Sequence, residues 1–138
     1  MKKVFYDSPV AKVLLSLSSC ETITLGPFVC SKLRKSEMRQ RVRNHECTHA
    51  RQWIEIVIVT GAIIWLLMLL FNLSALWLIF SVLAFYLWYG IEWFIRFVAT
   101  LDVKKAYKAV SFEREAYENQ EDSNYLENSH YFAWMRYL

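Results

Sequence analysis

Residues 43–71 read RNHECTHARQWIEIVIVTGAIIWLLMLLF, and within them a short polar motif passes directly into a long apolar run. The motif is His45-Glu46-x-x-His49. On a helix, residues four apart leave the same face, so the two imidazoles can bind one metal ion. Glu46 is then placed to accept a proton from a water on that metal. The alternative is a chance match on an ordinary amphipathic helix. The spacing favours a metal site.

The helix that carries the motif is predicted over residues 36–52, with Ser36 as its amino-terminal cap. The two histidines fall on the same stripe of this helix as the apolar residues Met38, Val42, Trp53 and Ile56. The arginines Arg39, Arg41, Arg43 and Arg51 lie mostly elsewhere around it. We therefore expect both histidines to face the interior, where a metal is shielded from solvent.

The apolar run from Trp53 to Phe71 has 19 residues, which at about 1.5 Å per residue span a hydrocarbon core of about 30 Å. A turn at residues 72–74 precedes a second apolar stretch, residues 75–97. A buried hairpin in a soluble protein is the alternative, but so short a chain could not cover two such helices on all sides. The sequence thus predicts a transmembrane hairpin over residues 53–97 and a lipid bilayer as a partner.

Charge is distributed around this hairpin in a way that predicts its orientation. Between Trp53 and Ile95 the only charged residues are Glu55 and Glu92, which we interpret as structural; Glu92 can pair with Arg96. Ten of the sixteen lysines and arginines lie in residues 1–51, and the other six lie from Arg96 onward. Positive charge on both sides of the hairpin predicts an integral protein of the inner (cytoplasmic) membrane, with both termini and the active site on the cytoplasmic side. A basic surface for nucleic acid is the competing interpretation, and we expect no such partner.

The whole chain, residues 1–138, is predicted to form a single domain that includes the hairpin. Residues 1–35 are expected to be rich in strands: Thr22–Leu25 and Phe28–Cys30 flank Gly26-Pro27, whereas 10–17 is either a strand or a short helix. A strand beside the metal helix can pair with an extended peptide, or it can simply close the core. Residues 98–138 are expected to be helical. The fold class is a mainly α membrane protein with a small amino-terminal β-hairpin.

The three cysteines, Cys20, Cys30 and Cys47, are odd in number and lack a C-x-x-C spacing. This pattern favours a reducing compartment over a disulfide framework. Cys47 lies inside the motif, and we interpret it as a packing residue.

A catalytic zinc site needs a third protein ligand. After the hairpin the candidates are Glu113, Glu115, Glu118, Glu121, Asp122, Glu127 and His130. Over residues 43–117 the chain resembles the integral-membrane zinc metallopeptidases of the gluzincin type, the HtpX and CAAX prenyl protease class. In that class a hairpin follows H-E-x-x-H, and the third ligand is the Glu of a later E-x-x-A-D motif. The resemblance implies a zincin-like metal helix and implies Glu113, in Glu113-x-x-Ala116-Tyr117, as the zinc ligand.

This chain has Tyr117 where the class has an Asp that supports the ligands, and Glu115 is the main rival ligand. For the donor to the reacting carbonyl oxygen the candidates are Tyr125, His130 and Tyr131, of which we choose His130. These features together predict a membrane-embedded zinc metallopeptidase that hydrolyses peptides or membrane-protein segments at the cytoplasmic membrane face. The alternatives are a non-catalytic membrane protein stapled by zinc and a small membrane interaction or regulatory protein.

Overall fold

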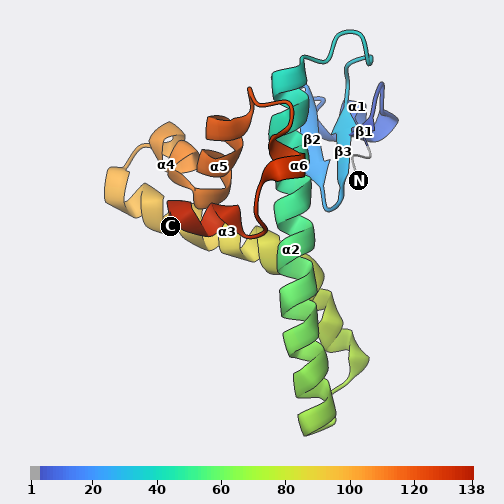
Figure 1. The fold of residues 1–138 in the computed structure, drawn as a ribbon, viewed down its shortest axis with the longest axis vertical. Helices are drawn as coiled ribbons and strands as arrows, with labels where there is room; N and C mark the ends of the chain where they lie inside the picture. Colours follow the sequence, from blue (N-terminus) through green and yellow to red (C-terminus); the bar gives the residue numbers. More distant parts are fainter. Residues whose placement is uncertain (1–3) are drawn as a thin grey trace. The chain divides into compact units, whose positions relative to one another are not determined.

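The computed structural model describes residues 4–138 and is mainly helical, with one small sheet (Figure 1). The predicted mainly α class and the amino-terminal β-hairpin are confirmed; the first three residues of the predicted lead-in lie outside the described part. In chain order the elements are β1 (Val4–Phe5), α1 (Pro9–Leu14), β2 (Thr22–Leu25), β3 (Phe28–Ser31), α2 (Gln40–Phe71), the 3-10 helix η1 (Ala75–Leu78), α3 (Ile79–Thr100), α4 (Val103–Ala109), α5 (Ser111–Asn119), α6 (Tyr125–Asn128) and the 3-10 helix η2 (Ala133–Tyr137).

The chain forms two compact units. The first comprises Met1–Arg51 with Glu115–His130, and the second comprises Gln52–Arg114 with Tyr131–Leu138. Two helices, α2 and α5, pass from one unit to the other without a break in the helix. The expectation of one domain over residues 1–138 stays a prediction.

The sheet of the first unit has the strand order β1-β3-β2. Strands β2 and β3 form the predicted antiparallel hairpin, in which Leu25 pairs with Phe28 and leaves a two-residue loop. Gly26 has a φ of 59°, which suits the first loop position of a primed turn, and Pro27 fixes its own φ. Strand β1 pairs parallel to β3 and was not predicted, because two residues are too few to show a periodic pattern. In the ambiguous stretch 10–17 the structure has helix α1, which Ser8 caps and which ends at Leu14; a turn follows.

The alternation of Thr22-Ile23-Thr24-Leu25 gives β2 two different faces. Ile23 and Leu25 pack against the cluster of Ala11, Leu15 and Cys30 beneath α1. On the other face, Val29 of β3, the partner of Thr24 in the register, packs against Cys47 and Ala50 of α2. The packing role predicted for Cys47 is therefore what the structure shows. The two threonines consequently lie on the face of the sheet that meets α2.

Helix α2 begins at Gln40, so the prediction that it begins at Ser36 is wrong. The residues before it form a turn instead. The backbone N–H of Arg34 donates to the Glu37 carboxylate over 2.9 Å, and the N–H of Glu37 donates to the carbonyl of Arg34 over 3.0 Å. Glu37 thus closes a local turn at the place where the first turn of the helix was predicted.

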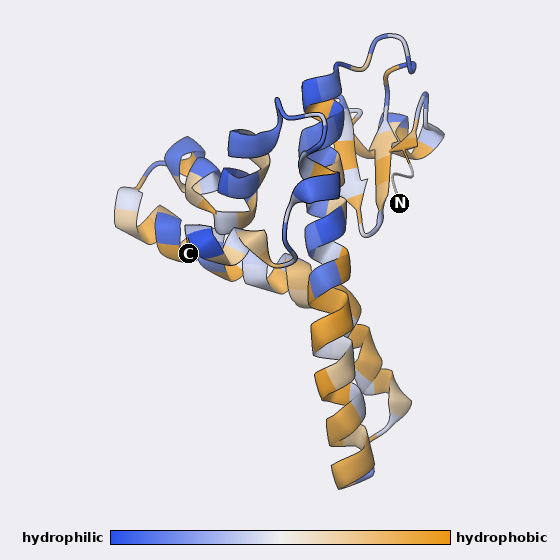
Figure 2. Cartoon of the chain, in the orientation of Figure 1, coloured by the Kyte–Doolittle hydropathy of each residue, from blue (hydrophilic) through white to orange (hydrophobic). Residues whose placement is uncertain are grey.

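In the second unit, the rest of α2 and helix α3 form the hairpin, and Figure 2 shows the lower part of α2 coloured mostly as hydrophobic. By length and composition both helices are long and apolar enough to cross a membrane, and only 11% and 17% of the residues in their most apolar stretches are buried. The helices approach closely at Gly61, where an added Cβ would lie 3.7 Å from Ser81. The indole N–H of Trp53 donates to the carbonyl of Val82 over 3.1 Å.

The helical segment expected over residues 98–138 follows α3 as the separate elements α4, α5, α6 and η2. Leu101 has a φ of 51° and ends α3, and Asp102 then caps α4. The backbone N–H of Lys105 donates to that carboxylate and holds the pKa of Asp102 below its ordinary value. The left-handed Leu101 cannot continue a helix, so it separates α3 from α4. Val110, with a ψ of 134°, lies outside the helical region and separates α4 from α5.

Helix α5 is fixed at its amino terminus by Glu92 of α3. The buried Glu92 carboxylate accepts from the Ser111 N–H over 2.9 Å and from the Ser111 hydroxyl over 2.7 Å. It also pairs with Arg96 over 3.2 Å, which confirms the predicted pair. A carboxylate at a helix amino terminus is favoured by the helix dipole. Beneath it lies the core cluster Phe85, Val110, Phe112 and Trp134. Together these contacts fix the start of the helix that carries Glu113.

Candidate metal centre

The amino-terminal half of α2 presents three faces, because successive residues are about 100° apart around a helix. Cys47 and Ala50 face the sheet. His45 and His49 share a second face. Glu46 projects between this histidine face and the face that meets the sheet. Asn44 lies on the third face, where its side chain donates over 3.0 Å to the carbonyls of Gln120 and Asp122. The motif is thus held in orientation by contacts on both sides of the histidines.

The two histidine rings meet at their Nε2 atoms, which are 3.1 Å apart, with ring planes at 85°. Two nitrogens bound to one tetrahedral zinc at about 2.0–2.1 Å would lie about 3.3 Å apart. The spacing therefore fits a shared metal, although a hydrogen bond between the rings has the same length. His49 is buried as predicted, and His45 retains some exposure.

Glu113 completes a group that can hold a metal ion. One ligand atom from each of His45, His49 and Glu113 lies within 4.8 Å of the others. Glu113 is only 2% exposed, and the hydroxyl of Tyr89 on α3 donates to its Oε1 over 3.0 Å. Such a hydrogen bond orients a ligand carboxylate. The structure thus groups the two histidines of the motif with Glu113, the third ligand that the resemblance implied.

Glu115, the rival ligand, has different partners. Two residues along α5 turn its side chain about 200° away from that of Glu113. Its carboxylate is fully buried, pairs with Arg51 over 3.2 Å and accepts from the Tyr125 hydroxyl over 2.7 Å. Arg51 also donates to the hydroxyl of Ser129. Glu115 therefore belongs to an ion-pair network that fastens α2 to the carboxy-terminal segment.

The side chain of Glu46 is held by β2. The Thr22 hydroxyl donates to Oε1 over 2.8 Å, and the Thr24 hydroxyl donates to Oε2 over 2.6 Å. Thr24 also lies 3.2 Å from the carbonyl oxygen of Glu46. These hydrogen bonds fix the orientation of the Glu46 carboxylate, and the residue stays partly exposed. Sequence reasoning treated β2 as a strand near the metal helix and missed these threonines as partners of Glu46.

Tyr117 packs against the metal group by its ring. Its centroid lies 4.6 Å from that of His45, with ring planes at 64°. This is the position at which the resembled class has an Asp. The aromatic contact restricts the orientation of the His45 ring by packing, where a carboxylate would do so by a hydrogen bond.

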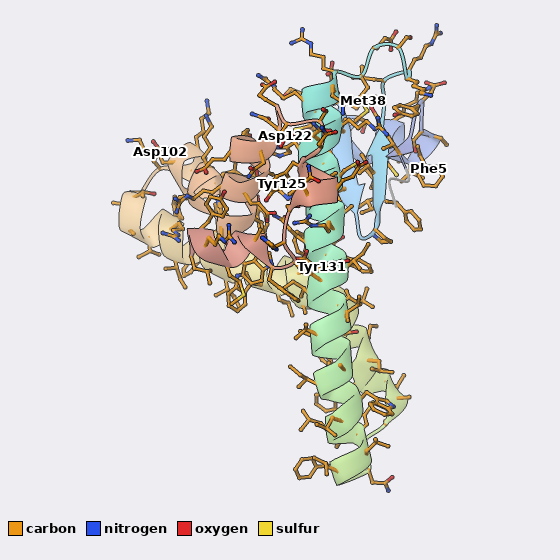
Figure 3. All side chains as sticks on the ribbon, viewed as in Figure 1. Phe5, Met38, Asp102, Asp122, Tyr125 and Tyr131 are labelled. Carbon is orange, nitrogen blue, oxygen red and sulfur yellow. The ribbon has the colours of Figure 1, made fainter. Side chains whose placement is uncertain are left out.

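His130 lies in the exposed segment after α6, and its backbone carbonyl accepts from Arg51 over 3.1 Å. The role predicted for its side chain, donation to a reacting carbonyl oxygen, stays a prediction. Figure 3 labels Tyr125 and Asp122, which lie along α2 in this unit. Tyr125, another candidate donor, is engaged with Glu115.

Three buried polar residues of α2 were missed by sequence reasoning. Asn44, Thr48 and Gln52 are 4%, 2% and 0% exposed, and they recur every four residues. Gln52 donates to the carbonyl of Phe112, the residue before Glu113, over 3.1 Å. The signal available in the sequence was a row of uncharged polar residues at helical spacing beside the histidines.

No family model matches the chain, and neither the curated proteins nor the solved structures contain a match.

Proposed function

We propose that this protein is a membrane-embedded zinc-dependent metallopeptidase that hydrolyses peptide bonds at the cytoplasmic face of a membrane. The observation that carries the proposal is the group of His45, His49 and Glu113, with Glu46 next to it on the same helix. The resemblance to the HtpX and CAAX prenyl protease class, drawn from H-E-x-x-H and the later E-x-x-A, agrees with it.

The donor set suits zinc. Two imidazoles and one carboxylate are a known catalytic ligand set, and they leave a fourth position open. Bound there, zinc would polarise a peptide carbonyl and lower the pKa of a water. The chain's own contribution is to hold the ligands: Tyr89 orients Glu113, and Tyr117 restricts His45.

Glu46 is the proposed general base and acid. It would take a proton from the attacking water and give a proton to the leaving amine. The hydrogen bonds from Thr22 and Thr24 do not exhaust it, because each carboxylate oxygen has two acceptor sites. His130 is the proposed donor to the carbonyl oxygen as charge develops there.

The proposed substrates are peptides and membrane-protein segments near the bilayer. Strand β2 lies at an edge of its sheet and touches Glu46 through its threonines. An extended peptide can add to such an edge by backbone hydrogen bonds. The apolar hairpin would hold the protein in the lipid, with its basic flanks on the cytoplasmic side.

The test is Glu46→Gln in purified, zinc-loaded protein. We expect hydrolysis of a peptide library to fall by about 10²–10⁴-fold, the usual contribution of a general base, while zinc content stays unchanged. Glu37→Gln, which alters a glutamate in the turn before α2, serves as the matched control and should retain activity. Equal activity of the wild type and Glu46→Gln would refute the peptidase.

A zinc-stapled membrane protein without catalysis is the second candidate. It is favoured by one observation: both Glu46 oxygens are hydrogen-bonded to β2, as they would be in a purely structural contact. In that case no peptide would be cleaved, and Glu46→Gln would lower only thermal stability. A wild-type protein that binds no zinc would instead favour an interaction or regulatory protein.

A further inference from the structure

We propose that Thr22 and Thr24 are positioning residues that fix the Glu46 carboxylate for its role in proton transfer. The inference rests on the proposed peptidase function and deepens it, because it assigns to β2 a part in the reaction. The side-chain hydroxyls of both threonines donate to Glu46, which is itself no member of the metal group. Their effect would be transmitted through Glu46.

The contacts are short and divided between the two oxygens. Thr22 reaches Oε1 at 2.8 Å and Thr24 reaches Oε2 at 2.6 Å. A glutamate side chain has three rotatable bonds, and restricting them costs conformational entropy. Two hydroxyls that hold one oxygen each set both the position of the carboxylate and the rotation of its plane. A single hydrogen bond would leave that rotation free.

The strand is a rigid support for this pair. Thr22 and Thr24 are two residues apart, so both hydroxyls leave the same face of β2. Between and after them, Ile23 and Leu25 are packed into the cluster under α1. On the next strand, Val29 packs against Cys47, the neighbour of Glu46 on α2. One cluster therefore holds the strand that carries the donors, and the cluster on the other face of the sheet holds the helix that carries the carboxylate.

Such support matters because the base must meet its proton within hydrogen-bond distance. A displacement of about 1 Å in a reacting group can cost about 10²-fold in rate. Glu46 is partly exposed, and an exposed glutamate without these donors would sample several rotamers. The threonine pair removes that freedom while it leaves Glu46 open to solvent.

The experiment compares the double variant Thr22→Val and Thr24→Val with Thr22→Ser and Thr24→Ser in zinc-loaded protein. We expect the valine pair to lower kcat by about 10–100-fold, with KM changed by less than about 2-fold and zinc content unchanged. The serine pair keeps both hydroxyls and should restore kcat. Thr100→Val, an exposed threonine that bonds its own helix, should change nothing.

A second measurement does not depend on activity. The threonine pair and Glu46 form a double-mutant cycle in thermal unfolding, with Glu46→Ala as the second change. We expect the valine pair to lower Tm in the wild-type background and to lower it much less in the Glu46→Ala background. Additive changes in Tm would show that the hydrogen bonds are absent, and would overturn the inference.

The outcomes separate the inference from the function beneath it. An active wild type whose valine pair retains full kcat overturns the positioning role and leaves the peptidase standing. An inactive wild type with a coupled cycle overturns the peptidase, and the positioning role with it, and leaves a structural contact between α2 and β2. An active wild type with a coupled cycle, a lowered kcat in the valine pair and rescue by serine supports both.

Discussion

The two halves of helix α2 differ more than any other adjoining regions of the molecule. In the first half, up to Arg51, polar side chains are buried or partly buried and are bonded to other parts of the chain: Asn44 to the segment after α5, Glu46 to β2 and Arg51 to Glu115. In the second half, large apolar side chains are exposed, among them Ile58, Ile63 and Leu70 at 65%, 54% and 66%. No break in the helix separates these environments.

The difference follows from what each kind of side chain requires. A buried polar group must have a hydrogen-bond partner, so the first half needs specific neighbours at fixed positions. An apolar side chain needs only removal from water, which lipid can provide as well as protein. A site with defined geometry is therefore expected in the first half, and the metal ligands contributed by α2 lie there.

The largest expected effect comes from breaking a contact of the first half. Arg51→Met leaves the Glu115 carboxylate buried without its cation, which should lower the free energy of unfolding by about 3–5 kcal/mol. Urea unfolding followed by tryptophan fluorescence measures it. Arg41→Met is the matched control, since its pair with Glu121 is exposed and should contribute only about 0–1 kcal/mol. Equal losses in both variants would show that the two pairs are equally solvated.

A smaller effect is expected in the second half. Ile63→Arg places a charge near the centre of the proposed crossing, which should disfavour insertion by about 2.5–3.5 kcal/mol. A membrane-integration assay with microsomes measures the inserted fraction. Val13→Arg, at an exposed apolar residue of α1, should insert like the wild type. Full insertion of Ile63→Arg would contradict the crossing, and with it the contrast between the two halves.

The smallest effect is expected from a residue of the apolar hairpin that orients a proposed metal ligand. Tyr89→Phe removes the hydroxyl that orients Glu113, and loss of such a partner usually weakens metal affinity by about 10–100-fold. Competition with a zinc chelator gives the dissociation constant. Tyr131→Phe, at a tyrosine that is 78% exposed, is the control and should bind zinc as the wild type does. Unchanged zinc affinity in Tyr89→Phe would show that the Tyr89 hydroxyl of α3 does not help Glu113 to bind the metal.

The sequence predicted those features that a local pattern records. The spacing of His45 and His49 predicted a shared helix face, the apolar run predicted the two long helices, and Gly26-Pro27 predicted the turn of the hairpin. Each of these depends on residues close together in the chain. The pairing of Glu113 with the histidines was suggested only through the resemblance to a known class.

Other features depend on contacts between distant segments and left no such pattern. The choice between Glu113 and Glu115 depends on where α5 begins, which Glu92 determines from 19 residues away. The partners of Glu46 lie 24 and 22 residues before it. The start of α2 was misplaced because Glu37 suits both a first helical turn and the local turn that it forms with Arg34.

The most direct test of the central claim is the zinc content of purified wild-type protein beside Glu113→Ala and Glu115→Gln, measured by mass spectrometry of the metal. We predict near one zinc per chain in the wild type, loss of zinc in Glu113→Ala and retention in Glu115→Gln, because only Glu113 lies with His45 and His49. A wild type without zinc, or zinc retained by Glu113→Ala and lost from Glu115→Gln, would contradict the site.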